Sequence, residues 1–455
     1  MAVRLIDSLA TTAAMEKLFC DESVLQAMLD FEAALARTEA RLGIIPQSAA
    51  DTIAKSAEAK NFDSAALARA ALRAGTPGIP LVKALTERVR AIDAGAAGYV
   101  HWGATSQDVA DTGLVLLLKQ AQLVLESDLA RLEQALERLS EQRSHTVMLG
   151  RTLMQAAPPV TFGLKAAGWL AAIRRSHAHL QSSFADALVL QFGGAVGTLA
   201  ALGDQGLATA RALAEDLGIG CPDAPWHTHR DRLAVLVCAL GVLTGTLGKM
   251  ARDISLLMQN EIGEVAEPGG EGRGGSSTMP HKRNPIGSTV TLAAANRVPG
   301  LVSSFLSGMI QENERGVGGW QAEWPTMSAI VQSAGLAVAS MAEVAEGLTV
   351  DAEKMRANIA ATNGVVFAER AMILLGKALG RDVAHRVLEE ATRRSVAQRR
   401  HLAEVLAEMP EVTDHLAAAS IRSLEDSEQY LGVADTLRKQ LLAGNPQRTS
   451  KTKRK

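Results

Sequence analysis

The sequence predicts an all-α protein whose centre is a bundle of long helices. Aromatic residues make up only 3 % of the 455 residues, whereas alanine and leucine are abundant, and this composition favours helices over strands. From 233 to 257 apolar residues recur at alternating intervals of three and four, which is the spacing of a helix that packs in a left-handed bundle. Five glycines then follow within 269–275. They predict a loop, because each glycine costs about 1 kcal/mol relative to alanine inside a helix.

The long helices can be placed along the chain by their apolar periodicity. An N-terminal helix is expected over about 23–42, with Gly43 as its C-terminal stop. Leucines over 125–139 repeat the rhythm of the segment that begins at 233. Within that later segment, Gly245 and Gly248 would let a neighbouring helix approach closely.

These signals predict four parts. We expect a helical N-terminal domain over 1–110, a central long-helix bundle over 111–350, a helical C-terminal domain over 351–440 and a basic, disordered tail over 441–455. The apolar faces of the long helices exceed what the rest of one chain can cover, so the central bundle is expected to form an oligomer.

Charge and cysteine content exclude several classes of function. The formal net charge is −2, which does not indicate nucleic-acid binding. Three scattered cysteines are too few for a disulfide framework or a cysteine-based metal site. The N-terminus has no signal-peptide pattern, and no uncharged run is expected to reach the roughly 18 residues of a membrane span. We therefore expect a cytoplasmic protein that binds neither nucleic acid nor a membrane.

Three segments carry the groups expected of an active site. The glycine-rich loop ends on Gly-Ser-Ser-Thr-Met-Pro-His-Lys-Arg-Asn-Pro at 275–285. Its hydroxyls, lysine and amide are the groups needed to transfer a proton at a carbon α to a carboxylate. The segment His-Trp-Gly-Ala-Thr-Ser-Gln-Asp at 101–108 opens a long helix, so its hydroxyls either cap that helix or hold a substrate carboxylate at the helix start. The third segment is Gly-Arg-Thr-Leu-Met-Gln-Ala-Ala-Pro at 150–158.

These three segments resemble the signature regions of the fumarase/aspartase superfamily. The loop matches every fixed position of the form G-S-S-x-M-P-x-K-x-N-P, and the other two match H-x-G-x-T-S-x-D and G-R-T-x-x-Q-x-A-x-P. Most members carry histidine directly after the threonine of the G-R-T segment, where this chain has Leu153. In the superfamily this segment is the second signature region, and the segment at 101–108 is the first. The bacterial carboxymuconate cycloisomerases also lack that histidine, and segments 79–85, 190–195 and 225–232 resemble theirs as well. The similarity extends from about residue 1 to about 435.

The resemblance implies a fold, an assembly and a reaction. It implies a fumarase-type helical bundle that forms a homotetramer, in which the three signature regions of one site come from three subunits. The implied enzyme interconverts an acyclic tricarboxylate diene and a lactone by proton transfer at a carbon α to a carboxylate, in protocatechuate breakdown. No cofactor or metal is implied.

The resemblance also assigns site residues. Ser276 occupies the catalytic serine position, and His101 is either its acid/base partner or a residue that orients neighbours and binds a carboxylate. Arg230 or Arg232, not necessarily both, is expected to touch the substrate, while some of the basic residues in or next to the matched segments are expected to pair with Asp108 or Asp231 instead. The residues assigned to substrate binding are Thr105, Ser106, Asp108, Arg151, Thr152, Gln155, His227, Arg230, Arg232, Ser277, Met279, His281, Lys282 and Asn284.

Two alternatives stay open at this point. One is a fumarate-releasing lyase of the adenylosuccinate type, against which Leu153 argues. The other is a structural homologue that has kept the fold and lost the chemistry, against which the intact serine loop and the Thr-Ser-x-Asp segment argue.

Overall fold

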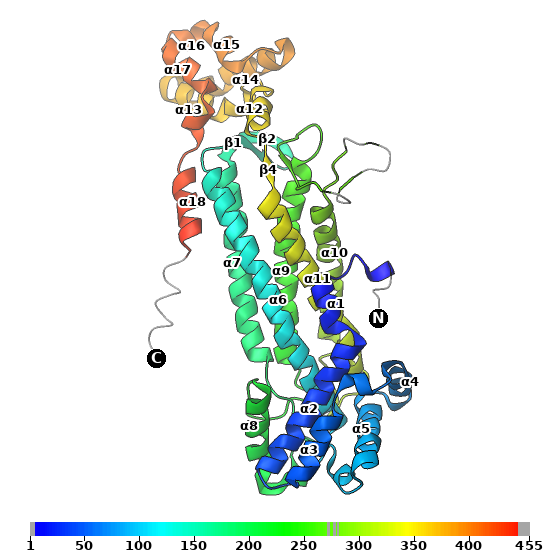
Figure 1. Ribbon diagram of the computed structural model, residues 1–455. Helices are drawn as coiled ribbons and strands as arrows, with labels where there is room; N and C mark the ends of the chain where they lie inside the picture. Colours follow the sequence, from blue (N-terminus) through cyan, green and yellow to red (C-terminus); the bar gives the residue numbers. More distant parts are fainter. Residues whose placement is uncertain (1–4, 271–273, 276–278, 280–281, 445–455) are drawn as a thin grey trace. The chain divides into compact units, whose positions relative to one another are not determined.

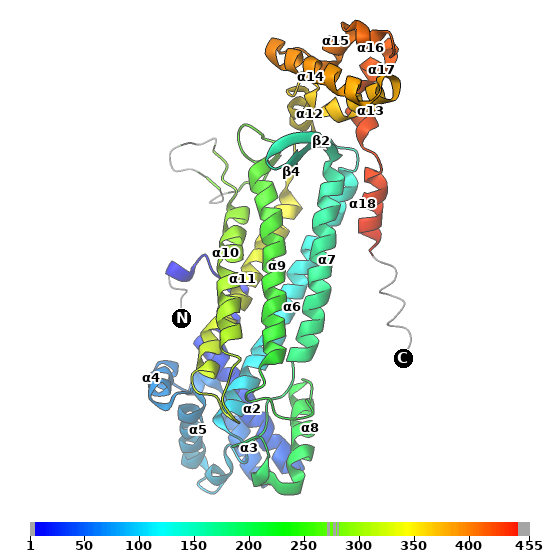
Figure 2. The same cartoon turned by 180° about the vertical axis from the view of Figure 1, so that it is seen from behind.

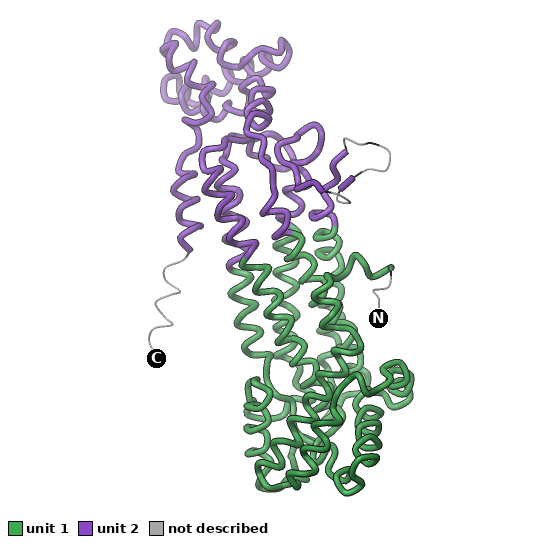
Figure 3. Tube along the Cα trace, viewed as in Figure 1, with its two compact units in different colours: residues 1–130, 175–248, 290–340 green, residues 131–174, 249–289, 341–455 purple. Residues whose placement is uncertain are grey.

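The computed structural model describes residues 5–270, 274–275, 279 and 282–444. It divides into two compact units, one made of residues 1–130, 175–248 and 290–340 and the other of residues 131–174, 249–289 and 341–455 (Figure 3). Nearly all regular structure in the described part is helical, so the predicted all-α class is confirmed. The four-part domain division drawn from the sequence stays a prediction.

Five long helices contribute residues to both units. They are α6 (Ser106–Gln142), α7 (Phe162–Ala187), α9 (Asp231–Leu257), α10 (Ile286–Ser307) and α11 (Gly319–Gly347). The eight apolar residues at alternating intervals in α9 are at most 4 % exposed, and the five leucines of α6 between 125 and 139 are at most 7 % exposed. The periodicity therefore identified both buried faces correctly.

The first unit also contains shorter helices around the start of α6. They are η1 (Leu5–Asp7), α1 (Ala13–Phe19), α2 (Asp21–Arg41), α3 (Gln47–Ser56), η2 (Ala59–Asn61), α4 (Ser64–Ala74), α5 (Gly78–Ile92), η3 (Ala96–Tyr99), η4 (Ala200–Gln205) and α8 (Gly206–Leu217). α2 lies beside α3 and α8 around a shared apolar core (Figure 1). It coincides with the helix predicted over 23–42, and Gly43 beyond it has a φ of 74°.

The second unit combines two short strand pairs with the C-terminal helices. Its elements are β1 (Val147–Thr152), β2 (Gln155–Thr161), β3 (Val265–Ala266), β4 (Thr349–Val350), α12 (Ala352–Ala360), η5 (Val365–Phe367), α13 (Ala368–Leu379), α14 (Arg381–Gln398), α15 (Leu402–Ala407), α16 (Pro410–Thr413), α17 (Ala418–Arg422), η6 (Ser423–Glu425), η7 (Ser427–Tyr430) and α18 (Ala434–Ala443). α13 to α17 enclose a separate apolar core that includes Leu375, Leu402 and Ile421. The predicted tail lies outside the described residues from 445 onward.

The antiparallel hairpin of β1 and β2 was not predicted from the sequence. Its register shifts between Leu149 and Gly150, and a side chain at Gly150 would meet the carbonyl oxygen of Pro158 at 2.4 Å. Glycine is therefore required at this bulge. The hairpin is too short for its alternation to stand out against the helical pattern on either side.

Close approach of a helix to α9 occurs at one of the two predicted glycines. A Cβ atom added at Gly248 would lie 2.6 Å from the Cβ of Ala295 in α10, whereas one added at Gly245 would meet nothing within 4 Å. Figure 2 shows α9 and α10 side by side. The prediction is confirmed at Gly248, whereas no other helix in the described part of the chain approaches Gly245.

Among the described residues, two helices have the length and composition of membrane spans. These are α9 and α11, and the bent pair 352–360 with 365–379 would add a third. Residues 324–342 of α11 contain no charged side chain, so the expectation that no uncharged run approaches a span was wrong. Of the apolar windows in α9 and α11, 56 % and 67 % are buried inside the protein. Helix packing accounts for most of this apolar surface.

We predict that the two glycines of α9 respond differently to alanine. Gly248→Ala should destabilise the protein by about 1–3 kcal/mol, because α10 must move away from the new methyl group. Gly245→Ala, the matched control, should be neutral or stabilise by up to about 1 kcal/mol through helix propensity. Chemical denaturation of both variants measures this difference, and equal stabilities would contradict the close contact.

Candidate active site

The first turn of α6 positions the residues of the signature segment at 101–108. The backbone N–H of Thr105 donates to Oδ2 of Asp108 at 3.0 Å, and the backbone N–H of Asp108 donates to the carbonyl of Thr105 at 2.9 Å. This reciprocal pair closes the start of the helix at Ser106. The positive end of a 37-residue helix and two hydroxyls therefore lie at one place.

Asp108 is fully buried and binds protein groups on all sides. Its Oδ1 accepts from Nε2 of His227 at 2.8 Å, from Nε2 of Gln191 at 3.2 Å and from the backbone N–H of Gly193 at 3.1 Å. Its Oδ2 accepts from the N–H of Gly194 at 2.9 Å in addition to Thr105. The carboxylate thus ties α6 to the segment 191–194 and to His227, and His227 is itself only 4 % exposed.

Arg230, immediately before α9, is held between two buried carboxylates. Its guanidinium donates to both oxygens of Asp111 at 2.8 and 3.0 Å and to Oε2 of Glu323 at 2.6 Å. The guanidinium also lies 4.7 Å from the ring centroid of Trp226, and Nε1 of Trp320 donates to Asp111 at 2.9 Å. Burial opposes the charge of Arg230, but Asp111 and Glu323 outweigh it and raise the pKa of Arg230.

Arg232 differs sharply from Arg230 although it is only two residues away. It is half-buried, and it donates to the backbone carbonyl of Asp186 at 3.1 Å. Of the two arginines, Arg230 has its donors occupied by carboxylates, whereas Arg232 has a single neutral partner in the described part of the chain.

His101 and Arg315 flank the start of α6. Nδ1 of His101 lies 2.6 Å from Oε1 of Glu32, which is buried on α2. Arg315, from the segment between α10 and α11, donates to Oγ1 of Thr105 at 3.0 Å. Burial lowers the pKa of Arg315, while Asp108 and Asp111 act in the opposite direction.

Glu32 and Arg315 were not predicted from the sequence. Glu32 and Glu39 lie seven residues apart on a helix that carries other charged residues and no motif, so nothing in the sequence singled out Glu32. Arg315 has no motif around it, and 210 residues separate it from Thr105 in the sequence.

In the second unit, the signature segment at 150–158 lies within the β1–β2 hairpin. Arg151 makes a bidentate ion pair with buried Glu264, with N–O distances of 3.0 and 2.6 Å. Thr152 ends β1, Gln155 begins β2, and both are exposed. Between them, Leu153 and Met154 form the two-residue turn.

The hairpin turn places apolar side chains where glycine or asparagine is usually found. Leu153 and Met154 have φ angles of 49° and 67°, and their side chains are 96 % and 70 % exposed. A two-residue turn with both φ values positive normally selects Asn-Gly, so these residues are unfavourable for the isolated turn. Backbone strain of this kind is often found at functional sites.

The signature loop is anchored at its base in the second unit. Buried Glu267 accepts from the N–H groups of Gly287 and Ser288, each at 2.8 Å, and thereby caps α10. Further along, the N–H of Asn284 donates to the carbonyl of Gly274 at 2.9 Å. Gly274 has a φ of 69°, and a Cβ there would lie 2.9 Å from the carbonyl oxygen of Asn284.

The loop residues themselves are only partly described. Lys282 and Met279 are exposed, and the N–H of Lys282 donates to the carbonyl of Met279 at 3.0 Å. Ser276, Ser277 and His281 lie outside the described residues.

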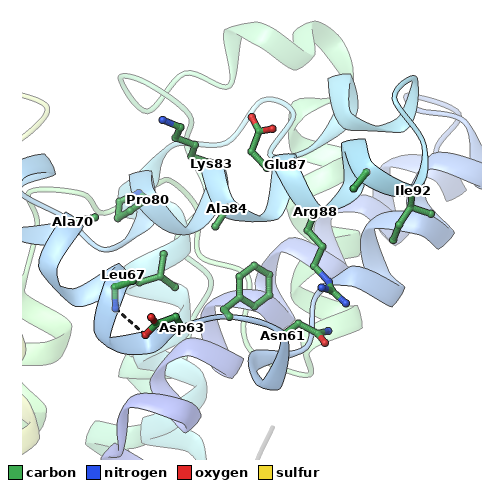
Figure 4. Close-up of a pocket in the computed structure, with 13 residues that line it drawn as sticks. Asn61, Asp63, Leu67, Ala70, Pro80, Lys83, Ala84, Glu87, Arg88 and Ile92 are labelled. Atoms are coloured by element: carbon green, nitrogen blue, oxygen red, sulfur yellow. Dashed lines mark hydrogen bonds between the residues drawn. The ribbon is translucent and has the colours of Figure 1, made fainter.

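A cavity elsewhere in the first unit contains none of these residues. It has a volume of about 800 Å³ and lies between α4 and α5, where Phe62, Leu67 and Ala84 line it. In Figure 4, Lys83 and Glu87 project away from α4, whereas Arg88 points toward Asn61. No cluster of three or more potential metal-binding side chains occurs among the described residues.

We predict that Arg230 and Arg232 contribute very differently to stability. Arg230→Ala should cost about 3–5 kcal/mol, because it leaves Asp111 and Glu323 buried without a cation. Arg232→Ala, the matched control, should cost at most about 1 kcal/mol, because it removes one hydrogen bond at a half-exposed site. Urea denaturation compares the two variants, and an unchanged stability of Arg230→Ala would contradict the network.

Comparison with known proteins agrees with these regions. A family model described as lyase matches residues 9–300, and one described as adenylosuccinate lyase C-terminus matches residues 364–441. A 3-carboxy-cis,cis-muconate cycloisomerase from Pseudomonas aeruginosa is 50 % identical over 95 % of this chain and 94 % of its own. One from Bradyrhizobium diazoefficiens is 47 % identical over 96 % of this chain and 97 % of its own.

A solved structure is similar over almost the whole chain. The crystal structure of 3-carboxy-cis,cis-muconate lactonizing enzyme from Pseudomonas putida has a TM-score of 0.91 and 46 % identity, and the match covers 97 % of this chain and 98 % of that one. The resemblance stated from the three signature segments is confirmed. The chain belongs to the lyase family of the fumarase/aspartase superfamily, on the branch of the 3-carboxy-cis,cis-muconate cycloisomerases.

Proposed function

We propose that this chain interconverts 3-carboxy-cis,cis-muconate and 4-carboxymuconolactone in protocatechuate degradation. The observation that carries the proposal is the similarity to cycloisomerases at 50 % identity over 95 % of the chain, together with Leu153 at the position where other lyases have histidine. In the lactonising direction a carboxylate oxygen adds to a carbon–carbon double bond, and a proton is delivered to the carbon α to another carboxylate. The reverse direction removes that proton and expels the carboxylate.

The geometry supports two kinds of role for the predicted residues. Asp108, His227 and Arg230 are buried and bound to one another or to other protein groups, so we assign them to positioning the site. The start of α6 with Thr105, Ser106 and Arg315 is suited to one substrate carboxylate, because hydroxyls, a guanidinium and a helix N-terminus meet there.

The remaining assignments concern the catalytic groups and the other carboxylates. Ser276 and His101 are the proposed catalytic residues, and Lys282 with Asn284 is placed to stabilise the extra negative charge of the intermediate. Ser277, Met279, His281, Thr152 and Gln155 are proposed to line the substrate. Arg151 reaches substrate only if its pairing with Glu264 leaves a donor free.

We further propose a homotetramer in the cytoplasm, with each site shared by three subunits. The exposed turn of Leu153 and Met154 supports this assembly, because two large apolar side chains in a strained turn gain stability when a partner covers them. Under this arrangement the turn of one subunit, the α6 start of a second and the signature loop of a third form one site.

An adenylosuccinate-type lyase is the second candidate. The match of residues 364–441 to the C-terminal region of adenylosuccinate lyase favours it, whereas Leu153 argues against it. A spectrophotometric assay with both substrates separates the two reactions. Fumarate release from adenylosuccinate without lactone formation would refute the cycloisomerase proposal.

We predict that the catalytic variants Ser276→Ala and His101→Ala each lower kcat/KM by at least about a hundredfold. The expected cause is the loss of proton transfer at the α-carbon. Circular dichroism of both variants controls for folding. A fall of less than tenfold in both would mean that the catalytic assignment is wrong.

We predict that the double variant Leu153→Asn, Met154→Gly keeps the hairpin and loses function. Asn-Gly relieves the strain of two positive φ angles, so the free energy of unfolding should not fall. The kcat/KM should drop by about tenfold or more, since the turn no longer presents apolar side chains to the shared site. Light scattering measures the assembly in parallel, and unchanged kcat/KM with an intact tetramer would contradict the role of the turn.

A further inference from the structure

Two carboxyl groups are buried on α2, a helix that carries none of the signature motifs. Glu32 is 1 % exposed and Glu39 is 0 % exposed. A separation of seven residues places them on the same side of the helix, about two turns apart. Oε1 of Glu32 contacts His101, whereas Oε2 of Glu32 and both oxygens of Glu39 have no hydrogen-bond partner among the described residues.

Glu39 resists ionisation because it is buried beside a second carboxyl group. Burial and the charge of Glu32 raise the pKa of Glu39 from 4.5 to about 9. Two like charges in one buried region are unfavourable, so one group takes up a proton. Glu39 is that group, whereas Glu32 is the carboxyl that contacts His101 at 2.6 Å.

Only one of the two ring nitrogens of His101 has a hydrogen-bond partner among the described residues. Its Nδ1 lies 2.6 Å from Glu32, and Nε2 has no hydrogen bond to the described residues. Burial disfavours the charged ring, but the charge and hydrogen bond of Glu32, together with the charge of Asp108 on α6, outweigh burial and raise the pKa of His101. Glu32 and Asp108 are the charged groups that act on it.

The backbone at His101 has an uncommon conformation. His101 has a φ of 62°, in the left-handed region that non-glycine residues rarely occupy. The contact with Glu32 orients the ring in spite of this strain. It fixes the ring between α2 and the start of α6, beside the hydroxyls proposed to hold a substrate carboxylate.

We propose that Glu32 is a positioning residue that keeps His101 as an imidazolium and presents its Nε2–H as the proton donor for lactonisation. This inference rests on the proposed function. In the step, the Nε2–H bond breaks and its electron pair stays on nitrogen. The electron pair of the substrate's carbanionic intermediate forms the new C–H bond. The Nδ1 proton stays on the ring and is donated to Glu32 throughout, so the ring becomes neutral imidazole and takes up a new proton from solvent after product leaves.

The first test reads the charge of His101 without any substrate. Exchange of its Cε1 hydrogen for deuterium, followed by mass spectrometry of the peptide that contains it, reports the pH midpoint of the ring. In the wild-type protein we expect a midpoint above the ordinary value of 6.5. Glu32→Gln should lower it, Glu32→Asp should lower it less, and Glu39→Gln should leave it in place. A wild-type midpoint at or below 6.5, or the same midpoint in Glu32→Gln, would overturn the proposal.

The second test measures kcat/KM for lactone formation in the same variants. Glu32→Gln should lose about tenfold or more, with the loss growing as pH rises, and Glu32→Asp should recover part of it. Glu39→Gln is the matched control, because an amide replaces a protonated acid on the same helix. A lowered midpoint with unchanged kcat/KM would refute the role of Glu32 in the reaction. Absence of turnover in wild-type protein with a raised midpoint would refute the proposed function alone.

Glu39→Gln carries its own stability prediction. Because the folded-state pKa of Glu39 is raised, the folded wild-type chain holds an additional proton between pH 4.5 and about 9 and loses stability as pH rises through this range. The glutamine variant lacks this loss, so its stability relative to wild type should increase steadily from pH 4.5 to 9. Urea denaturation across that range measures the effect, and a constant difference would show that Glu39 is ionised in the folded protein.

Discussion

The burial of Arg230 between Asp111 and Glu323 is the interaction on which the first unit depends. It joins the start of α9 to α6 and to α11 through charged groups that are at most 1 % exposed. Charges buried this deeply cost several kcal/mol each in lost hydration, so the network is stable only with every partner in place. That requirement fixes how the three helices meet. The same stretch of α6 carries Asp108 one turn earlier, and the position of the helix start follows from it.

Buried polar contacts extend from this network to the candidate site. Asp108 binds His227 and the segment 191–194, while its backbone closes the cap with Thr105. Thr105 in turn accepts from Arg315. The groups at the start of α6 are therefore supported by buried partners, which is the arrangement that a site with preorganised charges needs. In the second unit, Glu267 has the comparable task of holding the base of the signature loop on α10.

The sequence predicted the helices well because their signal is repeated many times along each one. Eight apolar positions in α9 are all buried, and one mismatch would not have hidden the pattern. The hairpin at 147–161 escaped because two short strands offer few repeats. The motifs located Thr105, Arg151 and Asn284, but they could not show that Arg230 faces two carboxylates instead of solvent. Arg315 and Glu32 were missed because they reach the site from distant segments, and only the folded chain brings them to the start of α6.

The turn at Leu153 also bears on how this family can change its chemistry. Its side chain is 96 % exposed, so in its own unit it contributes almost nothing to packing. An exchange of histidine for leucine at such an exposed position changes the chemistry of the turn and hardly changes the packing of the subunit. The fold rests instead on the buried ion pairs of Arg230 with Asp111 and Glu323, which this turn does not touch.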